Sequence, residues 1–297
     1  MSDKPQNSSP EAGIASRPPR KGSSKGQNLS TLLLVAVFLI GLCLLLYPTI
    51  SDAVNSITQT RVIADHEKNL SEMDDSNLEE LLAQALEYNR KLAESDQGWY
   101  LSQYETGIYN NMVNPFGNGM MGYIEIPGIQ VRLPIYHGVD EAVLQVGIGH
   151  LESTSLPVGG ESSHCVLSGH RGLPSARLFT DLDQLVEGDV FYIHVLNQTL
   201  VYQVDNIRIV EPEDLSALTI EEGKDYCTLV TCTPYGVNTH RLLVRGVRVD
   251  YTPQEVTELV ISGDATLLHP TQVLPLVAAP LLVILLIVLL FKYRKKA

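Results

Sequence analysis

The sequence DYCTLVTCTPYGVNTHRLLVRG, residues 225–246, is the stretch from which the rest of the chain can be interpreted. Its apolar and β-branched residues predict one strand that ends at Cys232 and a second that begins with His240 and Arg241. The Pro, Gly and Asn residues between them predict a turn. In an antiparallel hairpin of this length, Arg241 lies beside the sulfur of Cys232. The stretch therefore predicts a thiol and a fixed cation at one end of a β-hairpin.

A thiol beside a guanidinium group suits acyl transfer. The sulfur attacks a carbonyl carbon, and the N–H donors of the arginine stabilise the charge that develops on the oxygen. Such a reaction also requires a general base. The stretch LSGHRG, residues 167–172, supplies a candidate, because an apolar strand ends there and His170 follows it. A histidine at a strand end is more often structural, and its combination with Cys232 and Arg241 is what favours a catalytic role.

Seven stretches between residues 123 and 251 have the composition of β-strands, and Gly, Pro, Asp or Asn residues separate them. Short helices are predicted at residues 140–147 and 175–185, and a further helix at 252–262. Many short strands with few helices are typical of a closed barrel or a sandwich. The predicted strands are YIEIPGI, VRLPIYHG, HCVLSGH, DVFYIHVL, TLVYQVDNIRIV, DYCTLVTC and HRLLVRGVRVDY.

Two apolar runs flank this β-rich part. Residues 29–47 and 273–291 each have about the length that a bilayer-spanning helix requires, and the prolines of the second run are tolerated within a membrane. Basic residues lie outside both runs, so the positive-inside rule predicts that both ends are cytoplasmic and that residues 50–272 are exterior. The first run is alternatively a cleaved signal peptide, although Asp52 interrupts the small-residue cleavage site.

Composition divides the remainder of the chain. Residues 1–28 are rich in Ser, Pro, Gly and Lys, which predicts a disordered leader. A leucine stripe at helical spacing predicts helix between residues 53 and 93, with Asn77 as an N-cap. The predicted organisation is a cytoplasmic leader at 1–28, a membrane helix at 29–47, a helical segment at 52–118, the β-domain at 119–252, a linker at 253–272, a second membrane helix at 273–291 and a basic tail at 292–297.

The predicted exterior part is strongly acidic. The cytoplasmic ends hold nine of the 21 Lys and Arg residues and two of the 34 Asp and Glu residues, which leaves a net charge near −20 outside. This balance argues against nucleic acid as a partner. It would attract basic amine substrates, although acidity can equally serve to keep an exported domain soluble.

The four cysteines do not form a disulfide or metal pattern. Cys43 lies in the first apolar run, and the other three cysteines lie in the predicted exterior part. Because three is an odd number, they cannot all pair with one another. Cys227 and Cys232 are five residues apart on one strand, so they face opposite sides and cannot bridge each other. Cys165 and Cys227 are interpreted as small buried apolar residues. The sequence implies no metal and no organic cofactor.

The stretch from Met121 to Tyr251 resembles the sortases, cysteine transpeptidases on the exterior of Gram-positive bacteria. TLVTC is similar to the family's TLxTC motif with Cys232 as the nucleophile, SGHRG places His170 at the family's histidine, and Arg241 falls at its arginine. The resemblance covers roughly half of the chain and is closest to class C, the pilin-polymerising sortases. The strings that carry the class resemblance are MGYIEIP, LPIYHG, GHLESTSLPVGG, HRGLPSARLFTDLDQL and TCTPYGVNTHRLLVRG, together with the second membrane helix.

The resemblance implies an eight-stranded, mainly β barrel with the active site on one face. It implies a substrate with a Leu-Pro-x-Thr-Gly-like sorting signal, cleaved between Thr and Gly through a thioester on the cysteine and transferred to a lysine amine of a pilin subunit. Two alternatives stay open. One is a sortase that anchors surface proteins to cell-wall peptide, with a lipid-linked cell-wall precursor as its partner. The other is a binding or scaffold barrel without catalysis.

Class C sortases also carry a lid, in which an Asp-Pro-aromatic motif covers the thiol. Asp96 and Trp99 lie at the position that the resemblance implies for the lid, but without the proline. Residues 114–117, Asn-Pro-Phe-Gly, have the proline and the aromatic but lack the aspartate and lie very close to the first strand. Position favours Asp96 and Trp99 as the lid residues. Alternatively, Trp99 packs on the barrel.

Overall fold

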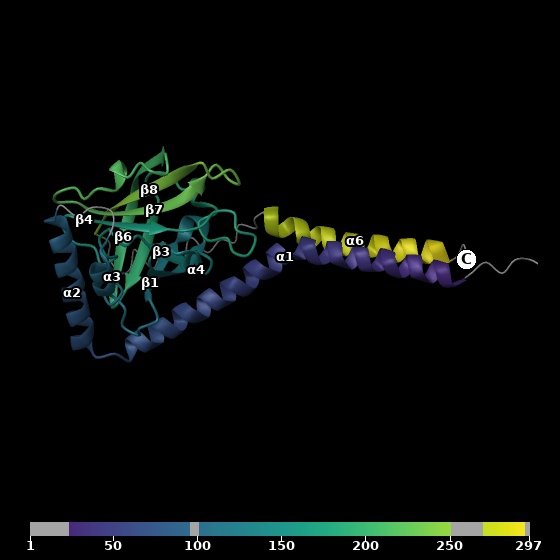
Figure 1. Cartoon of the computed structure of the whole chain (residues 1–297), viewed down its shortest axis with the longest axis horizontal. Helices are drawn as coiled ribbons and strands as arrows, with labels where there is room; N and C mark the ends of the chain where they lie inside the picture. The colour runs from purple at the N-terminus through teal and green to yellow at the C-terminus, as the bar shows by residue number, and fades with distance from the viewer. Residues whose placement is uncertain (1–23, 96–100, 251–269, 295–297) are drawn as a thin grey trace, which may run out of the picture. The chain divides into compact units, whose positions relative to one another are not determined.

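The structure is a computed structural model that describes residues 24–95, 101–250 and 270–294 (Figure 1). The chain divides after Leu44 into two compact units, and the β-rich part lies wholly in the second. The helix predicted at residues 252–262 lies outside the described residues.

Eight strands close into a barrel in the order β1-β2-β3-β4-β7-β8-β6-β5 (Figure 1). The β2–β3 and β4–β7 pairs are parallel, and the other neighbours are antiparallel. The predicted mainly β barrel is confirmed, and the sandwich alternative is wrong. The strands are β1 Met120–Ile126, β2 Val131–His137, β3 Ile148–His150, β4 Ser163–Ser168, β5 Val190–Val195, β6 Gln198–Val210, β7 Asp225–Thr233 and β8 His240–Arg248.

The barrel interior is filled by alternate side chains of the strands. On β7 the buried Cys227 and Leu229 point inward, which leaves Thr228 and Val230 on the outer face. Gly246 of β8 allows a close approach, because a Cβ at this position would lie 2.6 Å from the ring of Phe191. The strands thus pack tightly enough to fix which side chains face outward.

Helices α1, Ser24–Ser71, and α2, Asp75–Ala93, occupy most of the segment predicted to be helical. Asp74 caps α2 by accepting a hydrogen bond from the backbone N–H of Ser76 at 3.0 Å, so the prediction of Asn77 as N-cap is wrong by three residues. The other described helices are α3 Gln103–Tyr109, α4 Glu141–Leu144, α6 Pro270–Arg294 and three 3-10 turns, η1 Pro127–Ile129, η2 Leu182–Gln184 and η3 Ser216–Leu218.

The helix predicted at residues 140–147 is present as the short α4, but the one predicted at 175–185 is wrong. Only the 3-10 turn η2 forms there, because Leu178 adopts a left-handed conformation with φ of 42° and interrupts any regular helix. The apolar residues of this segment serve the core instead, since Leu178, Phe179 and Leu182 are all buried.

One described helix is long and apolar enough to cross a membrane. It is the part of α1 from Leu29 to Ser71, whose most apolar window has a mean hydropathy of 2.9 and is not buried by the rest of the molecule. Helix α6 contains a shorter apolar stretch, Val277–Phe291. The first predicted membrane span is therefore matched by a candidate helix. The apolar stretch described at the second predicted span is too short to establish a membrane helix.

The last turns of α1 and the whole of α2 pack on the barrel. Glu67 of α1 accepts hydrogen bonds from the hydroxyl of Tyr123 at 2.5 Å and from the guanidinium of Arg132 at 2.9 Å. Asn89 of α2 is buried, and its side-chain amide both donates hydrogen bonds to and accepts one from the backbone of the loop before β4. It donates to the carbonyls of Leu156 and Gly159 at 3.1 and 3.2 Å and accepts from the Leu156 N–H at 2.7 Å.

We predict that Asn89→Ala lowers the free energy of unfolding by about 2–4 kcal/mol, because it leaves two buried backbone groups, the N–H of Leu156 and the carbonyl of Gly159, without partners. Urea denaturation followed by near-UV circular dichroism measures this loss. Asn77→Ala, at an exposed position of the same helix, is the matched control and should change stability by less than about 0.5 kcal/mol. Equal effects of the two substitutions would contradict the argument.

Candidate active site

Cys232 and Arg241 are direct partners in the β7–β8 ladder. The register of the two antiparallel strands pairs Cys232 with Arg241 and Val230 with Leu243. Directly opposed residues of an antiparallel pair have their side chains on the same face, with Cβ atoms about 4.5–5.5 Å apart. Cys232 is half-buried, and its position alternates with the inward-facing Leu229 and Cys227. The thiol and the guanidinium therefore share the outer face at one end of the barrel.

The guanidinium of Arg241 is held by the turn that precedes it rather than by an acid. Its Nη1 donates to the carbonyl of His240 at 3.2 Å and lies 3.5 Å from that of Asn238. Among the described residues, no carboxylate forms an ion pair with it. An arginine with free donors and no counter-ion beside a thiol can stabilise a negative charge that forms on a bound carbonyl oxygen.

His170 lies next to this pair across the other edge of β7. Strand β4 runs parallel to β7 and ends with Ser168 opposite Val230, and His170 follows two residues after this last pair. Gly169 extends the ladder, because its N–H donates to the carbonyl of Val230 at 3.0 Å. Neighbouring strands lie about 4.8 Å apart. The structure thus brings all three predicted catalytic residues to one end of the barrel.

Gly169 has a specific packing role beside His170. A Cβ at this position would lie 2.7 Å from both Ile148 and Phe179, so only glycine lets the chain pass between them. The Gly169 carbonyl is also bonded by the hydroxyl of Thr231 at 2.8 Å. These contacts fix the backbone from which the imidazole projects.

An apolar groove leads away from the thiol along the outer face of β4, β7 and β8. Its cavity has a volume of about 170 Å³ and borders Arg241. Val166, Leu218 and Leu243 form a buried cluster here that is separate from the barrel interior, and Val230 packs against it.

A family model described as the sortase domain matches residues 124–249, which include all three residues. The crystal structure of sortase C1 from Streptococcus agalactiae is 53% identical to this chain, with a TM-score of 0.63, and the match covers 65% of this chain and all of that one. The chain belongs to the sortase family. Sortase homologues of this kind are cysteine transpeptidases.

Solved structures of class C sortases are among those similar to this sortase. Sortase C of Streptococcus pneumoniae, described for its pilin substrate specificity, is 47% identical with a TM-score of 0.58 over 65% of this chain and 98% of its own. Clostridium perfringens sortase C, solved with the C-terminal cell wall sorting motif, is 42% identical with a TM-score of 0.57 over 65% of this chain and all of its own.

Curated sortases match a shorter part of the chain. Sortase D of Bacillus subtilis is 32% identical over 131 residues, which are 43% of this chain and 63% of that protein. The chain thus spans less than two thirds of the length of this relative. The similarity to class C structures extends further along the chain than the similarity to this curated sortase.

Two side chains that the sequence did not single out lie next to the histidine of this sortase or to the loop that carries it. Glu141, at the start of α4, lies 3.4 Å from Nε2 of His170, and this imidazole contact helps to lower the pKa of the carboxyl, after its main hydrogen bond from Gln145. Arg171 pairs with Asp183 and lies 3.4 Å from the hydroxyl of Thr233. Arg171 therefore ties the histidine loop to the end of the strand that carries the thiol.

Helix α1 contacts both the loop that follows His170 and the residues that follow α4. The side chain of Asn55 donates to the carbonyl of Ser175 at 2.7 Å, and Asp52 accepts from the N–H of Arg177 at 2.9 Å. Gln59 donates to the carbonyl of Val146, directly after α4, at 3.0 Å. These positions fall on one face of the helix. The part of α1 that follows the apolar run thus supports both the histidine loop and the helix that carries Glu141.

The remaining predicted site residues can be placed as follows. Asp96 and Trp99 lie outside the described residues, so the lid remains a prediction from the family resemblance. Of the histidines outside the predicted site, His164 is buried and bonded to the hydroxyl of Thr228 at 2.7 Å. His240 pairs with Glu211 at 3.2 Å. No group of three or more potential metal-ligating side chains occurs within the part of the chain that the structure describes.

We predict that a water-soluble alkylating reagent modifies Cys232 of the folded protein long before Cys165 and Cys227. The two buried thiols are opposite each other on β4 and β7 inside the barrel, and burial raises the pKa of Cys227 well above its usual range. Peptide mapping by mass spectrometry after timed exposure to iodoacetamide distinguishes the three sites. Comparable labelling of Cys165 before unfolding would contradict the structure.

We also predict that the α1 contacts set the catalytic rate. The Asn55→Asp/Gln59→Glu protein keeps the shape of both side chains but loses two amide donors, so the rate of thioester formation should fall about tenfold while the KM for peptide stays constant. The groove is built from other elements, which is the reason for the constant KM.

The matched control for that protein is Ser56→Asp/Thr60→Glu, which adds the same charges at the same spacing on exposed positions of α1. It should react at the wild-type rate. If both double variants behave alike, or if KM rises in place of the fall in rate, the supporting role of α1 is refuted.

Proposed function

We propose that this protein is a membrane-anchored class C sortase that cleaves a Leu-Pro-x-Thr-Gly-like sorting signal between Thr and Gly and joins it to a lysine of a pilin subunit. The observation that carries the proposal is the Cys232–Arg241 register pair, with His170 two residues beyond the end of the adjacent strand β4. The similar structures of sortases described for pilin specificity and for a bound sorting motif support this substrate class.

In the first half-reaction the Cys232 thiolate attacks the carbonyl carbon of Thr. A C–S bond forms, and the guanidinium of Arg241 donates to the oxyanion. The tetrahedral intermediate then expels the Gly amine, which takes a proton from the imidazolium of His170. The product is a thioester between Cys232 and the threonine of the substrate.

In the second half-reaction the amine of a pilin lysine attacks the thioester. His170 accepts the proton that the amine loses, the C–S bond breaks, and the thiolate is restored as the isopeptide bond forms. Glu141 lies 3.4 Å from Nε2 of His170, beside the nitrogen-bearing edge of the ring. The acidic exterior part attracts the cationic lysine.

The same proposal includes two membrane spans with the barrel outside the cell. The apolar part of α1 supports the first span. Helix α6 has 25 residues, its described stretch Val277–Phe291 is apolar, and basic residues follow it in the sequence, all of which support the second. Two anchors would hold the barrel where secreted substrates with membrane-retained sorting signals emerge.

The test is to incubate the protein with a peptide that carries a sorting signal and to search for a covalent adduct by mass spectrometry. We expect an acyl adduct on Cys232 that is absent in Cys232→Ala and retained in Cys165→Ala. Arg241→Ala should reduce kcat/KM by about 10²–10³, the usual cost of one oxyanion donor. Adding a pilin subunit should yield a lysine-linked product.

Unchanged turnover in Cys232→Ala would defeat the enzyme proposal. A product linked to a cell-wall peptide amine rather than to pilin lysine would replace the pilin proposal with the anchoring alternative.

A further inference from the structure

The outer face of β6, β7 and β8 presents three successive rows of side chains. Strands β7 and β8 and strands β8 and β6 are paired in a register that aligns one residue of each strand per row. Rows are two residues apart along each strand, which corresponds to about 6.7 Å. The reactive row is Cys232, Arg241 and Val210; the middle row is Val230, Leu243 and Arg208; the distal row is Thr228, Arg245 and Asn206.

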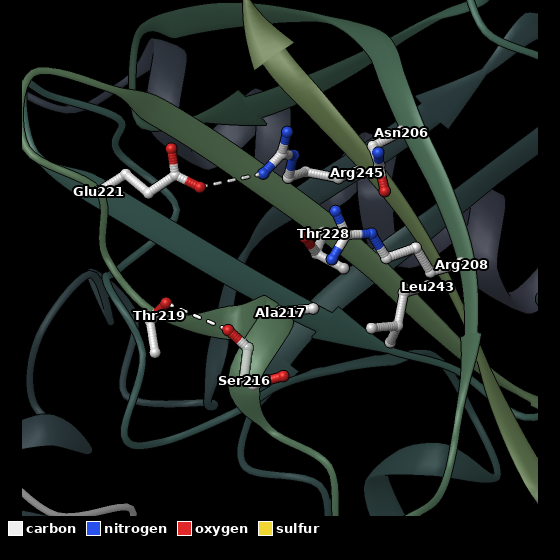
Figure 2. Close-up of a pocket in the computed structure, with 9 residues that line it drawn as sticks. All are labelled: Asn206, Arg208, Ser216, Ala217, Thr219, Glu221, Thr228, Leu243 and Arg245. Atoms are coloured by element: carbon white, nitrogen blue, oxygen red, sulfur yellow. Dashed lines mark hydrogen bonds and ion pairs between the residues drawn. The ribbon is translucent and has the colours of Figure 1, made fainter.

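The chemistry changes from row to row. The apolar groove beside the thiol uses Val210, Val230 and Leu243. Beyond it lies a second, polar cavity of about 80 Å³, which has Leu243 as a common wall and is closed on the opposite side by Ser216 and Thr219 of the β6–β7 loop (Figure 2). The two cavities thus adjoin at Leu243, with the apolar cavity on the side of Arg241 and the polar cavity on the side of Arg245.

The two arginines of the polar cavity differ in their charge balance. Arg245 is neutralised, because its guanidinium binds Asp205 at 2.8 Å and Glu221 at 3.3 Å. Arg208 is exposed and forms no ion pair with any described carboxylate. Its charge contributes to the lowered pKa of Asp214, but the Asp214 carboxylate already accepts two hydrogen bonds from Ser216.

Figure 2 shows the side chain of Arg208 extending from β6 toward Thr228, with Asn206 beside it on the same strand. The hydroxyl of Thr228 is bonded to His164 at 2.7 Å. The amide of Asn206 forms no hydrogen bond with any residue that the structure describes, and it lines the cavity with Arg208. The free donors in this cavity are therefore a guanidinium and a primary amide, which together suit a carboxylate.

The spacing of the rows matches the length of the sorting signal. With the Thr carbonyl at Cys232, an extended peptide places the Pro two residues back at the middle row and the residue before Leu four residues back. Four residues of extended chain span about 13 Å, the distance from the reactive to the distal row. The side chain that precedes the Leu-Pro-x-Thr-Gly motif therefore reaches the polar cavity.

We propose that this cavity is a subsite for an acidic side chain immediately N-terminal to the leucine of the sorting signal, with Arg208 as the residue that recognises it. The inference rests on the proposed function, because it takes the peptide to be bound with its Thr at Cys232. The exterior part of the chain is acidic as a whole and repels such a peptide, so local recognition requires an unmatched cation, which Arg208 provides.

The experiment compares three peptides, Glu-, Gln- and Lys-Leu-Pro-Gln-Thr-Gly, on the full chain in a neutral detergent. The rate of adduct formation on Cys232 should decrease in that order, with about a fivefold difference between Glu and Lys. The preference should shrink at 1 M salt, where the screening length is roughly 3 Å.

Arg208→Glu should reverse the order so that the Lys peptide reacts fastest. Arg61→Glu, an identical charge change at an exposed position of α1, is the matched control and should keep the wild-type order. An order that does not depend on residue 208, or an equal change in the Arg61→Glu protein, would overturn the subsite.

A binding measurement separates this inference from the proposed function. Fluorescence anisotropy of the labelled peptides on Cys232→Ala reports recognition without chemistry. Tighter binding of the Glu peptide without any adduct on the wild-type protein would support the subsite and refute the catalytic proposal. Equal binding and equal adduct formation with all three peptides would refute the subsite and leave the catalytic proposal standing.

Discussion

The site depends on the hydrogen-bond register between three strands. The β7–β8 ladder places Cys232 opposite Arg241, and the parallel β4–β7 ladder ends two residues before His170 at the same end of the barrel. A slip of one residue in either ladder would turn the affected side chain into the barrel. The interior prevents such a slip, because it would expose Leu229 and the other inward residues of these strands.

Local patterns in the sequence were sufficient for much of the fold. The alternation of apolar and polar residues and the turn residues predicted seven of the eight strands. The hairpin pattern at residues 225–246 predicted the Cys232–Arg241 pair. Strand β3 was missed because its three residues are too short to show a period. The prediction of a short helix at residues 175–185 was wrong, because the apolar residues of this segment pack into the core from an irregular backbone.

Contacts between distant segments could not be predicted from the sequence. Glu141, Arg171, Asn55 and Gln59 act through partners far along the chain, and polar residues on helix or loop surfaces carry no signal that distinguishes them from solvated ones. The rows on the outer face likewise require the register of β6 against β8, including the irregularity between Val204 and Asn206. Neither is visible in a single sequence.

The contacts of α1 affect how soluble fragments of this enzyme behave. A truncation that removes the membrane helix at a convenient point after residue 59 would also remove Asp52, Asn55 and Gln59, and with them the hydrogen bonds to Ser175, Arg177 and Val146. The barrel would still fold around its own core, yet its imidazole would be less well ordered. Rates measured on such fragments would understate those of the intact enzyme, and a cut before residue 52 would avoid this.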